Sequence, residues 1–324
     1  MKLLDTRRAI LASLLFGPAL AARAQGSWPE RSITLVVPFG PGGIADLTAR
    51  TVAQAMSAAL KVPIVIDNKP SAGSIVGSAA VAQAAPDGHT LLLMSNANAV
   101  SASLFRKLPF DVQKDFAPVS LLGVFDLALF VAAESKLKSV RELLDQAKSR
   151  PGKLTIGTIA VGSTQNLSAE LFKARTGIDA LIVPYKGTPA VLTALRAGEI
   201  DAAFEILGPM LPQLQAKAVR ALAVTSDRRF AALPEVPTMR EAGVADYEVA
   251  SWNALAAPAR TPAAVIERLN TAANEALKNP AVQERLLALG VRAQGGTPQQ
   301  LQALLASEVR HWGEVIRAAK IEPE

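Results

Sequence analysis

The sequence contains no cysteine and only two histidines among its 324 residues. Without cysteine the chain has no disulfide, no thiolate nucleophile, no Cys-ligated metal and no attachment point for a lipoprotein anchor. His89 and His311 are far apart in the chain, so a transition-metal site is not expected. We interpret both as structural or solvated residues, because His89 stands in a turn before a strand and His311 lies beside a tryptophan in a helical segment.

Motifs that mark enzymes are also missing. The sequence has no G-x-S-x-G elbow, no H-E-x-x-H pair and no P-loop. Catalysis needs a positioned acid, base or nucleophile, and no set of such residues stands out. We therefore expect a protein that is not an enzyme, with no cofactor, no catalytic residue and no metal ligand.

The first 24 residues are typical of an export signal. Three basic residues precede the apolar run Ala9–Leu20, which is too short to cross a bilayer as a folded helix. Ala22-Arg23-Ala24 fits a small-x-small cleavage site, so the mature chain is expected to begin near Gln25. Arg7-Arg8 leaves both the Sec and the twin-arginine routes open, and a buried N-terminal helix is the alternative interpretation. No other segment is long and apolar enough to span a membrane, so we expect a periplasmic protein.

The charge is only mildly positive. The signal carries four basic residues and one acidic residue, so its removal lowers the formal net charge from +6 to +3. This balance is too small to indicate a nucleic-acid partner. About 300 residues remain, and no internal repeat, charge run or flexible linker is visible. This length suggests two domains of roughly 150 residues each, joined by crossing strands rather than by a linker.

Strand-like and helix-like segments alternate over the first two thirds of the chain. Short apolar segments predict strands at Ile33–Val37, Ile64–Ile66, Thr90–Met94, Leu127–Val131, Leu154–Ile156, Leu181–Val183, Ala202–Phe204 and Ala221–Val224. Segments with helical periodicity lie between several of them, at Asp46–Leu60, Ile75–Ala84, Val140–Ser149, Ser163–Thr176 and Pro189–Ala197. This alternation is typical of an α/β fold with mainly parallel sheets.

The last third is predicted to be mostly helical. Three segments have proline at or near a helix start, where its missing N–H costs little: Pro262–Lys278, Pro280–Leu289 and Pro298–Ala319. Thr261 and Thr297 are natural N-caps for two of them. The crossing strands are expected within Ser120–Val131 and Val219–Ser226. Domain I would then comprise residues 27–122 and 226–324, and domain II residues 123–225.

The segment Ile33–Arg50 is the clearest functional signal. A β-branched strand ends in a Gly/Pro-rich turn that leads directly into a helix, and the unpaired N–H groups of a helix start favour an anion. Gly40–Ala45 also fits the dinucleotide spacing G-x-G-x-x-A, with Asp67 near the place of a ribose-binding acid. That alternative is disfavoured, because Asp46 would repel a pyrophosphate and Pro41 removes a donor. Export would also take the protein away from nicotinamide cofactors.

A series of motifs follows this segment in a fixed order. It runs through Asn68–Ser74, Pro86–Thr90, Val183–Gly187, Leu233–Thr238, Glu241–Gly243, Ala257-Pro258 and Thr261-Pro262. The series closely resembles the Bug family, the periplasmic solute-binding proteins of tripartite tricarboxylate transporters. The resemblance covers essentially the whole mature chain, and its specificity comes from the ordered set rather than from any single motif.

The resemblance implies a two-lobed periplasmic binding protein of the Venus-flytrap type, with mainly parallel sheets, a crossing-strand hinge and a helical C-terminal tail. It implies a small organic acid as the ligand, held by backbone N–H groups, small hydroxyls and waters. The implied partners are the membrane permease subunits of a tripartite tricarboxylate-type transporter. The alternative is a sensory co-receptor that feeds a two-component system through the periplasmic domain of a sensor kinase. In either role we expect a monomer.

The resemblance also implies ligand-binding residues in the first domain. The first binding loop is matched by Phe39, Gly40, Pro41, Gly42, Gly43, Ala45 and Asp46. Asp46 either caps its own helix or faces the ligand. Ser74 stands with Ser71 where the family usually has glycines, and both serines could simply cap the next helix. Ser95 and Asn96 follow the third strand, at the kind of strand end where open α/β sheets bind ligands.

In the second domain the resemblance implies a second anion cradle at Gly162, Ser163 and Thr164. Asn166 replaces a histidine that is frequent in the family and cannot become cationic. Tyr185 either contacts the ligand or packs at the rim, and Lys186 is more simply a solvated charge. Asp201 either binds a ligand donor or fixes the start of the next strand. Phe204 and Glu205 are expected at a strand end that lines the cleft.

Overall fold

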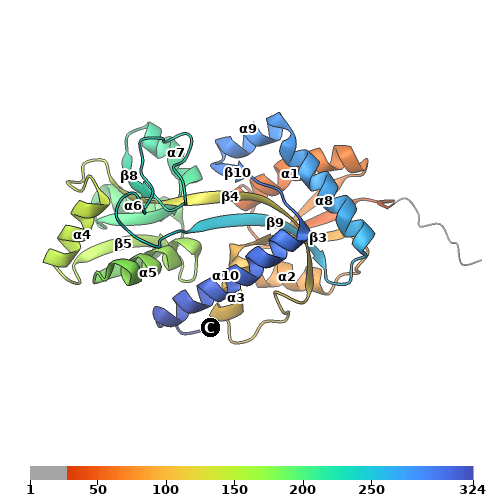
Figure 1. The fold of residues 1–324 in the computed structure, drawn as a ribbon, viewed down its shortest axis with the longest axis horizontal. Coiled ribbons are helices and arrows are strands. Elements are labelled where there is room, and N and C mark those ends of the chain that lie inside the picture. The colour runs from red at the N-terminus through yellow and green to blue at the C-terminus, as the bar shows by residue number, and fades with distance from the viewer. Residues whose placement is uncertain (1–27, 324) are drawn as a thin grey trace, which may run out of the picture.

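The computed structural model describes residues 28–323, and the expected signal and its cleavage site lie outside this range. The strand β4 (Phe116–Ala132) runs through both halves of the molecule (Figure 1). As far as Asp126 it pairs with β9 (Ala250–Pro258), and from Leu127 it pairs with β7 (Ala202–Ile206) and β8 (Val219–Val224). This change of partners divides the fold into two lobes that share β4.

Lobe I contains the strand order β2-β1-β3-β9-β4, and the short strand β10 (Val291–Ala293) pairs with the other side of β4. The strands β1 (Ile33–Val37), β2 (Ile64–Asn68) and β3 (Thr90–Ser95) are parallel to one another, whereas β9 is antiparallel to both β3 and β4. One core cluster packs these strands against α1 (Ile44–Leu60), α8 (Ala263–Lys278) and α9 (Pro280–Ala288).

The other side of lobe I is covered by η1 (Ala72–Ser74), α2 (Ile75–Ala82), α3 (Asn96–Leu104) and α10 (Pro298–Ala318). The core cluster on this side continues without a break into lobe II, where it includes Phe172, Phe204 and Tyr247. The long helix α10 packs on α3 and reaches α5 of lobe II. Apolar burial therefore joins the two lobes on this side of the sheet.

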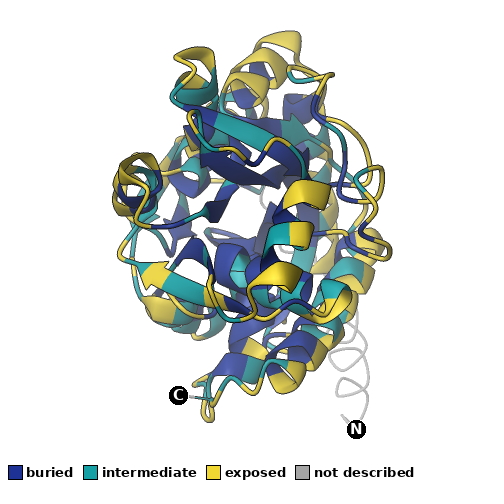
Figure 2. Cartoon of the chain, turned by 90° about the vertical axis from the view of Figure 1, so that its left-hand side faces the viewer, coloured by how far each residue is buried: buried dark blue, intermediate teal, exposed yellow. Residues whose placement is uncertain are grey.

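Lobe II contains the order β4-β7-β5-β6, with β8 on the opposite side of β4. The strands β5 (Leu154–Ile159), β6 (Ala180–Tyr185) and β7 are parallel. The helices are α4 (Val140–Ser149), α5 (Thr164–Thr176), α6 (Thr188–Ala197) and α7 (Leu207–Gln215). Figure 2 shows that buried residues lie on the strands and inner helix faces, while exposed residues lie on the outer faces.

All eight predicted strands and all eight predicted helices are present. Most differ little at their ends, but β4 begins at Phe116, eleven residues before the strand predicted at Leu127–Val131. The strands β9 and β10, the helices α3 and α7 and the short helix η1 were not predicted. The alanine-rich sequence of β9 has no clear period, because this strand is buried on both faces between β3 and β4. Thr297 caps α10 as expected, but Thr261 does not cap α8, whose N-cap is Pro262.

The segment 226–249 packs with lobe II rather than with lobe I. The Oγ of Ser168 on α5 lies 2.6 Å from the Tyr247 hydroxyl, and Thr238 pairs with the end of β8. The chain returns to lobe I only at Val249, whose N–H donates to the carbonyl of Thr225. We therefore propose lobe boundaries at 126/127 and 249/250, whereas the sequence led us to expect 122/123 and 225/226.

Within residues 28–323, no helix is long and apolar enough to cross a membrane. The same part of the chain contains no cluster of three or more histidine or acidic side chains that could hold a metal ion.

Candidate functional site

The carboxyl ends of the parallel strands in the two lobes face each other across the lobe junction. The strand β3 is parallel to β4 and therefore points from lobe I toward lobe II, whereas β7 is antiparallel to β4 and points back toward lobe I. Ser95 at the end of β3 is aligned, through Asn253 of β9, with Gly123 of β4, while Ile206 at the end of β7 is aligned with Leu127. Four residues of β4 correspond to about 13 Å. Two strand-end surfaces thus meet over a span that suits a small ligand.

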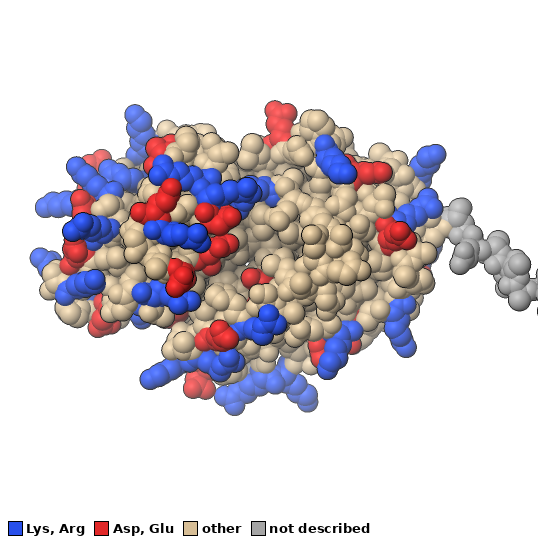
Figure 3. All heavy atoms as spheres, viewed as in Figure 1, with Lys and Arg blue, Asp and Glu red and all other residues tan. Residues whose placement is uncertain are grey.

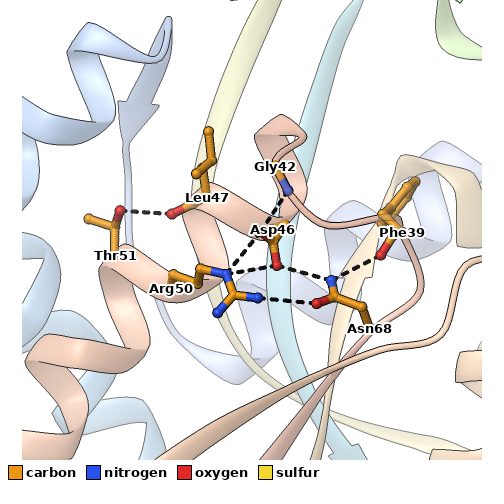
Figure 4. A network of polar contacts seen from close by, with 7 residues as sticks. All are labelled: Phe39, Gly42, Asp46, Leu47, Arg50, Thr51 and Asn68. Atoms are coloured by element: carbon orange, nitrogen blue, oxygen red, sulfur yellow. Dashed lines mark hydrogen bonds and ion pairs between the residues drawn. The ribbon is translucent and has the colours of Figure 1, made fainter.

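The loop after β1 is supported from behind by a polar network (Figure 4). Both carboxylate oxygens of Asp46 accept hydrogen bonds from Arg50 Nε, at 3.0 and 2.9 Å. Asn68 Nδ2 donates to Asp46 Oδ1 and to the carbonyl of Phe39, at 3.0 Å in each case. The N–H of Gly42 donates to Asp46 Oδ2 at 2.9 Å. These bonds fix the loop conformation and leave its outer surface exposed.

The carboxylate of Asp46 therefore already has hydrogen-bond partners within and behind its own loop. Its side chain is 2% exposed, and it lies one turn after the N-cap Gly43 rather than at the cap itself. Burial by itself would raise the pKa of this carboxyl, but the hydrogen bonds from Arg50, Gly42 and Asn68 outweigh burial and lower it. Asp46 thus remains ionised, and Arg50 balances its charge close to the loop.

The backbone of this loop is open to a ligand. A Cβ added at Gly40 or Gly42 would meet no atom within 4 Å, and Gly42 has φ +82°, a conformation that favours glycine. No described residue accepts a hydrogen bond from the N–H groups of Ile44 and Ala45, which begin α1. Unpaired N–H groups at a helix start, with no side-chain cap, are suited to bind an anion.

The loop after β5 in lobe II repeats the same local design. Gly162 has φ +75°, and its N–H donates to Asn166 Oδ1 at 3.1 Å, as that of Gly42 does to Asp46. Ser163 caps α5, because its Oγ accepts from the N–H of Asn166. The N–H groups of Thr164 and Gln165 then remain without a partner among the described residues. Each lobe therefore offers a helix start, but only lobe I places an ionised side chain behind it.

The remaining strand ends of lobe I are more enclosed. Ser71 Oγ accepts from the N–H of Val76 at 2.9 Å and so satisfies a donor in the first turn of α2. Ser74 is buried, has φ +60°, and its Oγ has no partner among the described residues. Ser95 caps α3 in a capping box with Asn98. The structure therefore places these serines at the facing edge, mostly as supports of the helix starts.

Asn96 and Thr164 bond to each other across the two lobes. Asn96 Nδ2 donates to Thr164 Oγ1 at 2.9 Å, and Asn96 Oδ1 accepts from Trp312 Nε1 of α10 at 2.8 Å. The indole N–H also reaches Glu308 Oε2 at 2.8 Å, and burial raises the pKa of Glu308. Because Trp312 can only donate, the amide oxygen of Asn96 must face it, which directs the amide nitrogen toward Thr164.

Three predicted site residues do not bring their side chains to the facing surface. Asp201 lies at the amino end of β7, where it accepts from the N–H and Oγ1 of Thr155, both at 2.8 Å. It fixes the start of that strand, at the sheet edge opposite to Gly162. Phe204 is fully buried and packs edge-on against Phe172 at 5.6 Å, and Ala45 is buried in the core beneath α1. Strand and helix periodicity directs the side chains of Phe204 and Ala45 inward.

Tyr185 lies at the facing edge but at its margin. It ends β6, which is the last strand of the lobe II sheet, and it is half-buried. Its ring packs over Gly157 and against the lobe II core, and Lys186 beside it is exposed. Of the two expected alternatives, ligand contact and packing at the rim, this position favours packing at the rim.

The sequence placed Glu205 at this edge but did not group it with Gln165 and Thr188, which bond to it. Glu205 is fully buried at the end of β7, where Oε2 accepts from Gln165 Nε2 at 3.2 Å and Thr188 Oγ1 at 3.0 Å, while Oε1 has no described partner. Burial raises the pKa of Glu205, and no described cation pairs with it. Gln165 and Thr188 begin two helices that follow neighbouring parallel strands, which is the signal that could have grouped them.

The arrangement suits binding rather than chemical conversion. The facing surfaces offer unpaired backbone N–H groups and small hydroxyls, and the carboxylate behind the lobe I loop, Asp46, already has its hydrogen-bond partners. Charge-assisted N–H bonds to a carboxylate are strong, and the two surfaces lie on separate lobes that a ligand could draw together.

Comparison with known proteins agrees with this geometry. Residues 48–321 match the family model described as the tripartite tricarboxylate transporter family receptor. Protein BugT of Bordetella pertussis is 37% identical over 293 residues, which cover 90% of this chain and 90% of that protein.

Two solved structures are similar over nearly the whole chain. The R. palustris protein Rpa4515 with adipate has 35% identity and a TM-score of 0.81, and the match covers 92% of this chain and 100% of that one. MatC from Rhodopseudomonas palustris with bound malate has 33% identity and a TM-score of 0.77, with 89% and 99% covered. These relatives are solute-binding proteins and not enzymes. The chain belongs to the tripartite tricarboxylate transporter receptor family of periplasmic solute-binding proteins, which includes the Bug proteins.

Proposed function

We propose that this protein binds a small organic acid between its lobes, with one carboxylate on the helix start of α1 and the opposite end of the ligand on that of α5. The observation that carries the proposal is the pair of matching glycine turns, at Gly42 and Gly162, on strand ends that point toward each other. Similar proteins hold adipate and malate, which supports a carboxylate as the ligand class.

The same contacts explain how binding would change the protein. A ligand shifts an equilibrium between open and closed lobes only by its differential affinity for the two states. An anion that touches both helix starts binds the closed state better, because the second set of N–H bonds exists only there. The ligand-bound, closed form would then be presented to the permease subunits of a tripartite tricarboxylate-type transporter after export to the periplasm and signal cleavage.

A thermal-shift screen of the mature protein against a panel of carboxylates tests the ligand class. At a concentration 100 times its dissociation constant, a ligand should stabilise the fold by about 2.7 kcal/mol. Binding of sugars or peptides, without binding of any organic acid, would contradict the proposal.

A matched pair of variants tests the site. Gly42→Val should abolish binding, because it strains the turn and places a side chain on the open face of the loop. Gly177→Val is the control, because Gly177 also has positive φ (+67°) and open space, but lies at the far end of α5. Equal affinities of the two variants would remove Gly42 from the site.

Adipate uptake by cells that lack the gene, compared with cells carrying the intact gene, tests the transport role separately.

A further inference from the structure

Lobe II contains a second concavity, separate from the facing strand ends. A cavity of about 910 Å³ lies between α4, the end of α7, β8 and the segment 232–242. Its floor is apolar and includes Val140, Leu211, Leu214, Val219, Ala221 and Leu233. None of the residues at the facing strand ends lines it. Cavities of this size and composition are typical binding sites.

One wall of this cavity is an incompletely paired strand. On one side β8 pairs with β4, and on its other side pairing begins only at Val224, which exchanges backbone hydrogen bonds with Pro237 and Met239. The preceding residues 219–222 all line the cavity, and no described strand lies beside them there. An unpaired strand edge is a template for an additional strand.

The rim of the cavity is predominantly basic. Lys138 and Lys217 are exposed, and no described carboxylate lies within ion-pair distance of either. Arg141 is 3.9 Å from Asp145, with both side chains largely exposed. Of the two acids on the rim, Glu241 is neutralised by Arg229 at 2.8 Å. Figure 3 shows many Lys and Arg side chains over the lobe II end of the molecule, with Asp and Glu side chains among them.

We propose that this cavity binds an extended, acidic segment of a partner protein, which adds a strand to the free edge of β8. Side chains of a strand alternate between two faces, so such a segment would place apolar residues on the cavity floor and acidic residues toward the basic rim. The free strand edge favours a peptide over a small anion, because a small anion would leave the backbone groups of residues 219–222 that face away from β4 unpaired.

Fluorescence anisotropy with a labelled hexapeptide of alternating valine and glutamate tests the proposal on the mature protein. Two further probes are the same peptide N-methylated at alternate residues, which keeps its charge but cannot pair as a strand, and benzoate as a small apolar anion. The acidic peptide should bind and protect from hydrogen exchange those amides of residues 219–222 that face away from β4, whereas the N-methylated peptide should not bind.

Charge reversal at the rim provides the matched variants. Arg141→Glu with Lys217→Glu should weaken peptide binding by at least about tenfold, through loss of electrostatic complementarity. Lys153→Glu with Arg196→Glu changes the net charge equally outside the cavity and should leave affinity within about twofold. Equal binding of the N-methylated peptide, equal effects of the two double variants, or binding of benzoate alone would overturn the proposal. Binding of the carboxylate panel between the lobes is measured in parallel, and failure of every carboxylate would count against the proposed function only.

Discussion

The bond between Asn96 and Thr164 leads to the sharpest prediction. Thr164→Val replaces the hydroxyl by a methyl group of similar size and leaves Asn96 Nδ2 without its acceptor. Asn96 is 1% exposed and cannot turn its amide, because Trp312 holds the amide oxygen. The substitution therefore removes an attraction between the lobes without disturbing either helix start.

The magnitude follows from the energetics of one hydrogen bond. A neutral bond contributes about 0.5–1.5 kcal/mol, and an unsatisfied buried partner raises the loss toward about 3 kcal/mol. This bond is partly buried, so we expect a loss of about 1 kcal/mol in the closed state. Because apparent affinity scales with the population of the binding-competent state, the dissociation constant should rise about fivefold. The rise should appear mainly in the dissociation rate.

Isothermal titration and stopped-flow dissociation measure this effect with each carboxylate that stabilises the wild type. A bond between the lobes affects every ligand by the same factor, whereas a direct ligand contact of Thr164 would affect ligands differently. Asn96→Ala should weaken binding similarly, and the double variant should be no weaker than the stronger single variant. Ligand-dependent losses, or additive losses in the double variant, would refute the reasoning.

Three further predictions concern stability. Gly162→Ala should destabilise the protein more than Gly42→Ala. Both turns have positive φ, but the Cβ added at 162 would collide with Leu104 Cδ2, whereas the Cβ added at 42 meets no atom. Chemical denaturation should show that Leu104→Ala recovers part of the Gly162→Ala loss and none of the Gly42→Ala loss. Asp46→Asn should lower the free energy of unfolding by about 1–3 kcal/mol at neutral pH. It should also reduce the loss of stability below about pH 4, because the lowered pKa of Asp46 in the folded state makes the wild type lose this stabilisation as pH falls. Melting curves across this range measure the effect, and an unchanged acid profile would contradict the assignment. The wild type should lose stability as pH rises above about 4.5, because the raised pKa of Glu205 means that the folded state holds the proton more tightly than the unfolded chain. Glu205→Gln should remove this decline. Identical profiles of stability against pH for the two proteins would show that Glu205 does not titrate differently on folding.

Local sequence signals proved sufficient for most elements. The segment Ile33–Arg50 folds as the strand, turn and helix start that its residues indicate, because turn glycines and helix periodicity act over a few residues. The strand β9 escaped prediction because its alanine-rich sequence carries no period and its strand conformation depends on neighbours more than about 120 residues away in the chain. Asp201 was ambiguous for the same reason, since only the register of β5 and β7 places it at the edge opposite to the site.

The sequence by itself determined the class of this protein: an α/β chain without enzyme motifs, with an ordered set of motifs that identifies its family. It also located both glycine turns, because the residues that build each turn are neighbours in the chain. Only the tertiary structure decided which groups those turns leave free. The Asp46 carboxylate accepts hydrogen bonds from Arg50 and Asn68, and the Thr164 hydroxyl accepts one from Asn96, which lies 68 residues away in the chain. Such pairings depend on how β4 holds the two lobes together, and long-range register of this kind leaves no local trace in the sequence.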